Sequence, residues 1–320
     1  MSGFPLRLLR NLVLAGILLL LTAPAQAQQK MTVALDWFVN PDHAPLIIAK
    51  ELGYFSRSGL DVELIAPANP NDPPKLVAAG KIDLAVSYQP QLHLQVAEGL
   101  PLKRIATLVA TPLNSLVVLK SGPIKSIKDL KGKKIGFSVG GFEDAILGIM
   151  LEREGLSLKD IELINVNFSL SPSIISGSVD GVIGAFRNFE LNQMDIVGKP
   201  GLAFYPEEHG VPAYDELIVI ANSGKLKDDR FPKFLTALEN ATIYLMNHPE
   251  ESWKTFIKAH PKLDDELNRR AWRDTLRRFA KRPRAYDEQR YADFAEFLKD
   301  RGLIKEVRGP EDYGIVIRRN

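Results

Sequence analysis

Short apolar and β-branched runs alternate with helical patterns through the first two-thirds of the chain. Such runs predict strands, and apolar residues repeated at three- and four-residue spacing predict helices. Strands that alternate with helices indicate βαβ units and a largely parallel sheet. The predicted strands are 31–35, 60–65, 82–87, 104–110, 116–119, 134–139, 161–166, 179–186 and 217–221. The predicted helices are 44–52, 74–79, 91–98, 127–130, 144–154 and 171–176.

Two segments of this alternating region share one layout. Residues 79–86 and 176–183 each contain a helix end, a glycine, an apolar residue, an aspartate and the start of a strand. Because glycine is a common helix stop, chance similarity between two such turns is one interpretation. The other interpretation is a protein with two lobes of like architecture.

From residue 231 onward the pattern is helical. Apolar stripes at helical spacing are typical of a buried core rather than of a cofactor site. The stripes consist of Phe231, Phe234, Leu235 and Leu238, then Trp272, Leu276 and Phe279, and then Tyr291, Phe294, Phe297 and Leu298.

These patterns predict an α/β protein with two lobes. The first lobe is expected to combine residues 28–116 and 217–320, including the C-terminal helices, and the second to hold residues 117–216. Two parallel-type sheets would then be joined by two crossing strands, near 116–120 and 216–221. A lobe inserted into another through two crossings makes a cleft that closes about a hinge.

The first 27 residues have the pattern of a secretory signal peptide. Arg7 and Arg10 form a positive region, residues 12–21 are apolar, and Ala25-Gln26-Ala27 is a small-x-small cleavage site. An apolar run of about ten residues is too short to span a membrane. We therefore expect export with cleavage after Ala27, and an uncleaved N-terminal anchor is the alternative.

Charge and cysteine content indicate the cellular location to expect. The sequence has 41 Lys and Arg and 39 Asp and Glu, and loss of the two arginines of the signal segment leaves a formally neutral mature protein. A neutral surface gives no general attraction to nucleic acid or to an anionic membrane. The chain has no cysteine, and hence no lipid-modified cysteine after the signal. The expected location is therefore the periplasm of a Gram-negative bacterium.

Aromatic, amide and carboxylate side chains follow several predicted strands. Open parallel sheets bind ligands at this edge, beyond the carboxyl ends of their strands. These side chain types suit a flat, polar, partly cationic ring better than an anion. The candidate ligand-binding residues are Asp36, Trp37, Asn40, His43, Tyr88, Gly140, Gly141, Phe142, Phe186, Asn188 and Glu190.

Several candidates also have a purely structural interpretation. Trp37 could pack between a strand and a helix, Asn188 could cap the next helix, and Glu190 could favour a helix start through the helix dipole. Gly140 and Gly141 could form only a turn, or could free backbone N–H groups for a ligand.

Residues that would carry catalysis or hold a metal are sparse. None of the five histidines forms a pair at i, i+4, and no cysteine is available to complete a zinc site, so we predict no catalytic and no metal-ligating residue. The basic stretch 269–284 is interleaved with the apolar stripe of Trp272, Leu276 and Phe279, which favours a solvated helix face. A docking face for a membrane importer is the alternative.

Three segments carry a family resemblance. Residues 35–44 read Leu-Asp-Trp-Phe-Val-Asn-Pro-Asp-His-Ala and are similar to an Asp-Trp-x-x-Asn-x-x-His motif, and residues 49–63 are similar to the segment that follows it. Residues 184–190 read Gly-Ala-Phe-Arg-Asn-Phe-Glu and resemble a Gly-x-Tyr-Trp-Asn-x-Glu segment. Together, over roughly residues 30–250, the chain resembles the thiamine pyrimidine-precursor family.

The resemblance implies one of two activities. One branch of that family consists of binding proteins that take up formylaminopyrimidine, a thiamine breakdown product. The other is a cytosolic synthase that builds the thiamine pyrimidine from its own histidine and pyridoxal phosphate. The signal peptide and the absence of the synthase branch's cysteine-rich motif separate this chain from the synthases. Phe186-Arg187 stands where the family has Tyr-Trp, which removes one stacking ring.

The resemblance therefore implies a two-lobed, type II periplasmic solute-binding protein that needs no cofactor and is not an enzyme. It would capture a thiamine-precursor pyrimidine or a similar heteroaromatic, and deliver it as a monomer to an ABC importer permease in the inner membrane. No nucleic acid partner is expected. The same scaffold serving a riboflavin precursor or an alkanesulfonate is the alternative, and a synthase-like enzyme is the third.

Overall fold

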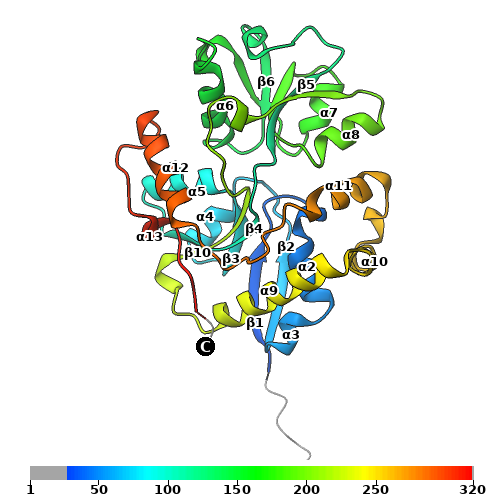
Figure 1. Cartoon of the computed structure of the whole chain (residues 1–320), viewed down its shortest axis with the longest axis vertical. Coiled ribbons are helices and arrows are strands. Elements are labelled where there is room, and N and C mark those ends of the chain that lie inside the picture. Colours follow the sequence, from blue (N-terminus) through cyan, green and yellow to red (C-terminus); the bar gives the residue numbers. More distant parts are fainter. Residues whose placement is uncertain (1–26, 319–320) are drawn as a thin grey trace, which may run out of the picture.

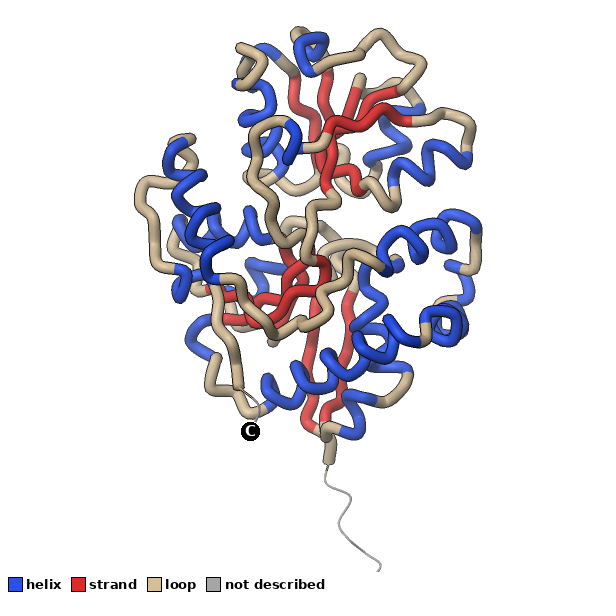
Figure 2. The backbone as a smooth tube through the Cα atoms, in the orientation of Figure 1, coloured by secondary structure: helices blue, strands red, loops and turns tan. Residues whose placement is uncertain are grey.

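The computed structural model describes residues 27–318 as two lobes, each built on one five-stranded sheet (Figures 1 and 2). The predicted signal peptide lies outside the described residues, except for Ala27. Within residues 27–318, no helix combines the length and the hydrophobicity that a membrane span requires.

The first sheet has the strand order β2-β1-β3-β10-β4, in which β10 runs antiparallel to both of its neighbours. Its strands are β1 (Gln29–Ala34), β2 (Leu60–Ile65), β3 (Leu84–Ser87), β4 (Leu102–Val109) and β10 (Leu217–Asn222). The second sheet has the order β7-β6-β8-β5-β9, with β5 antiparallel to both neighbours. Its strands are β5 (Asn114–Leu119), β6 (Lys134–Phe137), β7 (Glu162–Asn165), β8 (Gly181–Phe186) and β9 (Gly201–Phe204). The two sheets share one topology, which confirms two lobes of like architecture.

Helices surround both sheets and extend the first lobe at its C-terminal end (Figure 1). The α-helices are α2 (Ala44–Glu51), α3 (Tyr54–Arg57), α4 (Pro73–Ala78), α5 (Gln89–Ala97), α6 (Glu143–Glu152), α7 (Leu170–Ile175), α8 (Glu190–Ile196), α9 (Arg230–Asn247), α10 (Pro249–Ala259), α11 (Glu266–Leu276), α12 (Glu288–Asp300) and α13 (Pro310–Tyr313). The 3₁₀ helices are η1 (Pro41–His43), η2 (Ile127–Leu130), η3 (Leu158–Asp160), η4 (Pro206–Glu208), η5 (Ser223–Lys225) and η6 (Pro261–Leu263).

The C-terminal apolar stripes form part of the core, as predicted. Helix α9 packs against α2 and α3, and α10 packs against α2. Leu276 and Phe297 are partly buried and pack against the same core. The buried members of the stripes are Phe231, Phe234, Leu235, Leu238, Trp272, Phe279, Tyr291, Phe294 and Leu298.

One predicted feature of the sheets is confirmed and another is corrected. Four of the five strands in each sheet run in the same direction, so the sheets are largely parallel as predicted, and only β10 and β5 run antiparallel to their neighbours. Strands β5 and β10 each lie wholly within one sheet, and η4 still contacts β5 and α6, so the chain passes between the lobes at 110–113 and 209–216. The strands expected to cross near 116–120 and 216–221 therefore begin only after each crossing, and a boundary at 116 would divide β5.

Strand β9 was not among the predicted strands. It is an edge strand, and among residues 27–318 it pairs with β5 alone. A Cβ atom on Gly201 would lie 2.8 Å from Val117 and 2.9 Å from Leu191. The glycine therefore permits a close approach of β9 to β5, and the apolar alternation that marks other strands is missing here.

The repeated glycine–aspartate layout has the same role in both lobes. Each glycine ends a helix with a positive φ. In the first lobe, Oδ2 of Asp83 accepts the backbone N–H of Thr32 in β1 at 2.8 Å. In the second lobe, Oδ2 of Asp180 accepts the backbone N–H of Lys134 in β6, also at 2.8 Å. Each aspartate thus ties the turn after a helix to a neighbouring strand.

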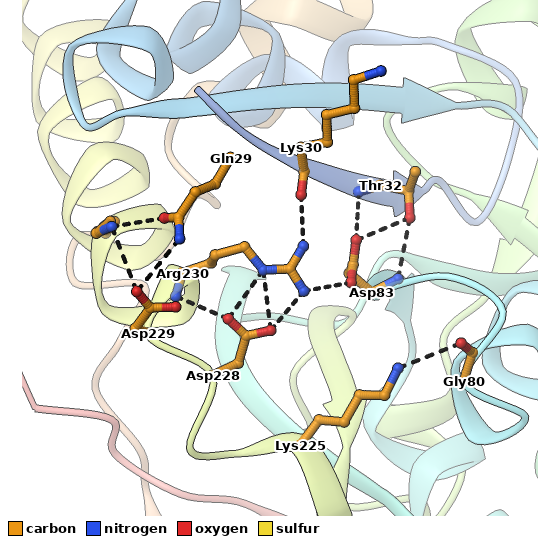
Figure 3. A network of polar contacts seen from close by, with 10 residues as sticks. Gln29, Lys30, Thr32, Gly80, Asp83, Lys225, Asp228, Asp229 and Arg230 are labelled. Atoms are coloured by element: carbon orange, nitrogen blue, oxygen red, sulfur yellow. Dashed lines mark hydrogen bonds and ion pairs between the residues drawn. The ribbon is translucent and has the colours of Figure 1, made fainter. Parts of the chain in front are cut away.

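Asp83 also joins an ion-pair network at the N-terminal ends of β1 and β3 (Figure 3). Nη2 of Arg230 lies 2.8 Å from Oδ1 of Asp83 and 2.6 Å from Oδ2 of Asp228. Nη1 of Arg230 donates to the backbone carbonyl oxygen of Lys30 at 2.5 Å. The network attaches the start of α9 to β1 and β3, and so anchors the C-terminal helices to the first sheet.

Asp83→Asn is expected to cost more stability than Asp180→Asn. Asp83→Asn removes a carboxylate charge that interacts with both Arg230 and a backbone N–H group. The carboxylate of Asp180 is exposed, so water already stabilises its charge. We expect the free energy of unfolding to fall by about 1–2 kcal/mol for Asp83→Asn and by under about 1 kcal/mol for Asp180→Asn. Urea unfolding of both variants measures the difference, and equal losses would contradict the role given to the network.

Candidate ligand-binding site

A pocket lies between the two lobes. It is lined by Asp36, Trp37, Asn40, Asp42, Tyr88, Glu143, Leu170, Gly184, Phe186, Phe189 and Glu190. Six of the eleven predicted residues are among them: Asp36, Trp37, Asn40, Tyr88, Phe186 and Glu190. The structure therefore brings residues at the strand ends of both sheets together in one pocket. Their contact with a ligand stays a prediction.

Asp36 follows β1 and is held by two hydrogen bonds. The Tyr88 hydroxyl donates to Oδ2 of Asp36 at 2.8 Å, and Nε2 of His43 lies 2.9 Å from Oδ1. The backbone N–H of Asn40 points to Nδ1 of His43 at 3.3 Å, which assigns the ring proton to Nε2. His43 is fully buried and does not line the pocket, so it positions Asp36 instead of facing a ligand.

The spacing of the Asp-Trp-x-x-Asn-x-x-His motif follows from a short helix. Asn40 is the N-cap of η1, where its side chain accepts the backbone N–H of Asp42 at 2.8 Å. His43 completes a capping box by accepting the backbone N–H of Asn40. The turn therefore places the His43 ring against Asp36, and it holds Asn40 at the pocket wall.

Aromatic rings from both lobes form the other walls. The half-buried ring of Trp37 packs edge-on against Phe168 of the second lobe, with ring centroids 4.6 Å apart. Tyr88 meets Phe186 edge-on at 6.4 Å and stacks on Phe142 at 5.1 Å. Phe142 is buried and does not line the pocket, so it supports Tyr88 from behind.

Two buried carboxyl groups of the second lobe face the pocket. Oε2 of Glu190, at the start of α8, accepts the backbone N–H of Phe186 at 2.7 Å. Oε2 of Glu143, at the start of α6, accepts the backbone N–H of Ser138 at 2.7 Å. Burial raises the pKa of each carboxyl group to about 8. At neutral pH both groups are therefore mostly protonated, and each can donate one hydrogen bond as well as accept.

Gly184 makes room for Glu143. Its φ is 98°, and a Cβ atom at this position would lie 2.3 Å from Oε1 of Glu143. Only glycine combines this backbone conformation with so close an approach of the carboxyl group.

Besides His43 and Phe142, three further candidates do not line the pocket. Gly140 and Gly141 do not line the pocket, and the backbone N–H of Gly140 donates to Oδ1 of Asn71 in the first lobe at 3.0 Å. Gly140 thus contributes to the contact between lobes, which corrects the expectation that its N–H group is free for a ligand. Asn188 is also buried behind the pocket wall, where its Nδ2 lies 2.6 Å from Oδ1 of Asp42.

Five lining residues were not among the candidates. Glu143 and Phe189 follow the same strands that supplied other candidates. The expectation that ligands bind beyond the carboxyl ends of strands could therefore have identified both residues. Leu170 carries no polar group to mark it, whereas Gly184 is the first residue of the recognised segment 184–190. Asp42 lies within the recognised motif, and only its place in η1 shows that it faces the pocket.

The unliganded protein should lose stability as pH rises from about 5 to about 8. Burial raises the pKa of Glu143 and Glu190 to about 8, and that of Glu216 to about 7, from the ordinary value of 4.5. Their contribution is complete below pH 4.5 and is lost as pH rises through the folded-state values, because the unfolded chain releases these protons first. Each group lowers the free energy of unfolding by up to about 1.4 kcal/mol per pH unit.

Urea unfolding at several pH values measures this slope. Acids with a lowered pKa change the free energy of unfolding only below about pH 4. Asp129, which accepts the backbone N–H of Lys125, is one of them. Glu143→Gln cannot ionise, so it should remove one group's share of the slope. An unchanged slope in this variant would show that Glu143 is ionised in the folded protein.

Comparison with known proteins places the chain in a family. A family described as NMT1/THI5 like matches residues 40–252. A putative thiamine biosynthesis protein of Haemophilus influenzae is 55% identical over 300 residues, which cover 93% of this chain and 96% of the relative. The chain belongs to the NMT1/THI5-like family.

Two other relatives of this NMT1/THI5-like protein are named for different activities. The formylaminopyrimidine-binding protein of Halalkalibacterium halodurans is 34% identical over 234 residues, covering 72% of this chain and 71% of the relative. The 4-amino-5-hydroxymethyl-2-methylpyrimidine phosphate synthase of Schizosaccharomyces pombe is 29% identical over 251 residues, covering 75% and 72%. The family resemblance found in the sequence is thus confirmed, and the relatives include both binding proteins and synthases.

Solved structures show the fold of this family member. The alkanesulfonate-binding protein from Xanthomonas axonopodis pv. citri, bound to MOPS, has a TM-score of 0.70 and 15% identity, covering 90% of this chain and 98% of that one. The periplasmic aliphatic sulphonate binding protein from Escherichia coli has a TM-score of 0.65 and 14% identity, covering 91% and 93%. These likenesses confirm the two-lobed periplasmic binding protein fold. Family and fold together support a solute-binding role.

Proposed function

We propose that this NMT1/THI5-like protein is the periplasmic substrate-binding component of an ABC importer. It captures a thiamine-precursor pyrimidine, or a similar heteroaromatic, in the cleft between its lobes. It then presents the solute to the importer permease in the inner membrane. It acts as a monomer, needs no cofactor and catalyses no reaction.

The observation that carries this proposal is the chemistry of the pocket wall. Aromatic rings of Trp37, Tyr88 and Phe186 accompany four carboxyl groups, and no Lys or Arg is among the described residues that line the pocket. The carboxyl groups are those of Asp36, Asp42, Glu143 and Glu190. Rings of this kind stack on flat heteroaromatics. An aminopyrimidine presents an exocyclic amine beside a ring nitrogen, which a protonated carboxyl group matches with one acceptor and one donor.

An alkanesulfonate suits this pocket poorly, although the fold is shared with sulfonate-binding proteins. Sulfonate oxygens only accept hydrogen bonds, and charge-assisted recognition of such an anion uses Arg, Lys or several N–H donors. Asp36 presents an acceptor that two donors already orient. An anion beside it would meet repulsion instead of a partner.

The synthase relatives raise a second candidate, an enzyme that uses pyridoxal phosphate. Among the described residues that line the pocket there is no lysine to hold the aldehyde and no cationic side chain to hold the phosphate. His43, which contacts the lining residue Asp36, is buried with both ring nitrogens engaged. The residues present do not fit that cofactor, so binding is the better supported function.

Mass spectrometry of the small molecule that co-purifies with the protein tests the ligand class. A thermal-shift screen of pyrimidines, flavins and sulfonates complements it. We expect an aminopyrimidine to co-purify and pyrimidines alone to raise the melting temperature, because a ligand that binds only the folded state stabilises it. A bound flavin or sulfonate would contradict the proposed ligand.

A further inference from the structure

A hydrogen-bonded cluster connects the pocket to the contact between the lobes. It consists of Asp42 in η1, Thr275 in α11 and Asn188 of the second lobe, and each is at most 1% exposed. Nδ2 of Asn188 lies 2.6 Å from Oδ1 of Asp42 and 2.7 Å from Oγ1 of Thr275. Oγ1 of Thr275 lies 2.8 Å from the same oxygen of Asp42. Because Asn188 comes from the other lobe, the cluster is complete only when the lobes are together.

The second oxygen of Asp42 is in a different situation. Asp42 lines the pocket, and its Oδ2 is buried without a hydrogen-bond partner among the described residues. A buried acceptor without a partner is costly. Burial also raises the pKa of Asp42 to about 6, which shows how poorly this site solvates the charge. A ligand N–H group at Oδ2 would supply the missing partner.

We propose that Asp42 is a ligand-binding residue that holds two partners at once. Oδ2 accepts an N–H group of the bound heteroaromatic, from an exocyclic amine or a protonated ring nitrogen, while Oδ1 accepts Asn188 of the second lobe. The inference rests on the proposed pyrimidine-binding function. It adds the residue that couples occupancy of the pocket to closure of the cleft.

The coupling follows from both bonds acting on one carboxyl group. An N–H donor at Oδ2 favours the ionised form, and an ionised carboxylate accepts the Asn188 amide more strongly. Closure in turn removes water from the pocket and strengthens the bond to the ligand. A ligand shifts an open–closed equilibrium only by its difference in affinity for the two states, and this carboxyl group provides such a difference.

The chain offers a matched control at the rim of the cleft. Nδ2 of Asn192 in α8 donates to Oδ2 of Asp274 in α11 at 2.8 Å. The same kind of Asn–Asp bond therefore joins the same two lobes, but neither residue lines the pocket. Asp274→Asn removes a charged acceptor between the lobes without changing a ligand contact.

Calorimetric titration with two pyrimidines tests the proposal. The probes are 4-amino-5-hydroxymethyl-2-methylpyrimidine and 5-hydroxymethyl-2-methylpyrimidine, which lacks the amine. We expect Asp42→Asn to weaken binding of the first probe by about fivefold and to change binding of the second little. Asp274→Asn should weaken both probes equally, by less than about twofold.

A second variant separates the coupling from any effect on folding of η1. Asn188→Ala leaves Asp42 intact and should weaken the amine-bearing probe more than the amine-free one. The losses from Asp42→Asn and Asn188→Ala should be less than additive in the double variant, as for residues that act through one contact.

The outcomes distinguish this inference from the proposed function. If the wild-type protein binds neither probe, the pyrimidine function fails and the inference fails with it. If the wild type binds the amine-bearing probe while Asp42→Asn binds it equally well, the function stands and the inference is overturned. If Asp42→Asn and Asp274→Asn lower the affinity for both probes equally, Asp42 only joins the two lobes and the inference is likewise overturned.

Discussion

Glu190→Gln is expected to lower the affinity for the pyrimidine ligand by about tenfold or more, while the melting temperature of the unliganded protein barely changes. Glu190 lines the pocket and is 7% exposed, and its Oε2 accepts the Phe186 N–H group. The amide keeps the shape of the side chain and can still accept that N–H group. What is lost is the acidic O–H group, which can pass its proton to the ligand's ring nitrogen and so form a charge-assisted hydrogen bond.

The structural alternative for Glu190 gives the opposite result. A charged acid at the start of α8 would contribute about 0.3–1 kcal/mol through the helix dipole. Burial raises the pKa of this carboxyl group to about 8, so the group is mostly uncharged at neutral pH and that contribution is small. Calorimetry and thermal unfolding of the same variant separate the two roles. A lower melting temperature with unchanged affinity would make Glu190 structural and remove it from the site.

Trp37→Ala should weaken ligand binding by at least tenfold. Its ring lines the pocket and is held edge-on by Phe168 across the cleft, 4.6 Å between centroids. Stacking on a flat ligand contributes about 0.5–1.5 kcal/mol beyond the apolar area buried, and about 1.4 kcal/mol is one decade in affinity. The loss of area adds to the loss of stacking.

Phe38→Ala is the control for Trp37→Ala. Phe38 is the next residue along the chain, is 40% exposed, and does not line the pocket. Its ring contacts Trp37, Phe168 and Phe189, so its removal disturbs the same aromatic cluster. We expect less than about a threefold change in affinity from Phe38→Ala. Normal affinity in a correctly folded Trp37→Ala protein would show that the ring does not contact the ligand.

The parts of the site that depend on local order were predictable from the sequence. Asp36, Trp37 and Tyr88 follow strands, and parallel strands bring their carboxyl ends to one edge of the sheet. The glycine–aspartate layout also recurs because each lobe uses it to tie a turn to a neighbouring strand. Both features arise from a few neighbouring residues, which a sequence pattern records.

Features that depend on distant contacts were not predictable in this way. Asn188 and Asp42 are 146 residues apart in the chain and meet only because the lobes close on each other. The protonation of Glu143 and Glu190 depends on burial, which no pattern of neighbouring residues reveals. The antiparallel strands β5 and β10 likewise follow from two crossings between lobes, whereas the alternation of strands and helices favours parallel neighbours.

The pocket between the lobes is proposed to bind an amine-bearing heteroaromatic and to reject an anion. Isothermal titration calorimetry of the purified protein at neutral pH, with 4-amino-5-hydroxymethyl-2-methylpyrimidine and with the sulfonate MOPS, tests this most directly. We predict saturable binding of one pyrimidine per chain and no binding of MOPS over the same concentrations. Saturable binding of MOPS without binding of the pyrimidine would contradict the proposed function.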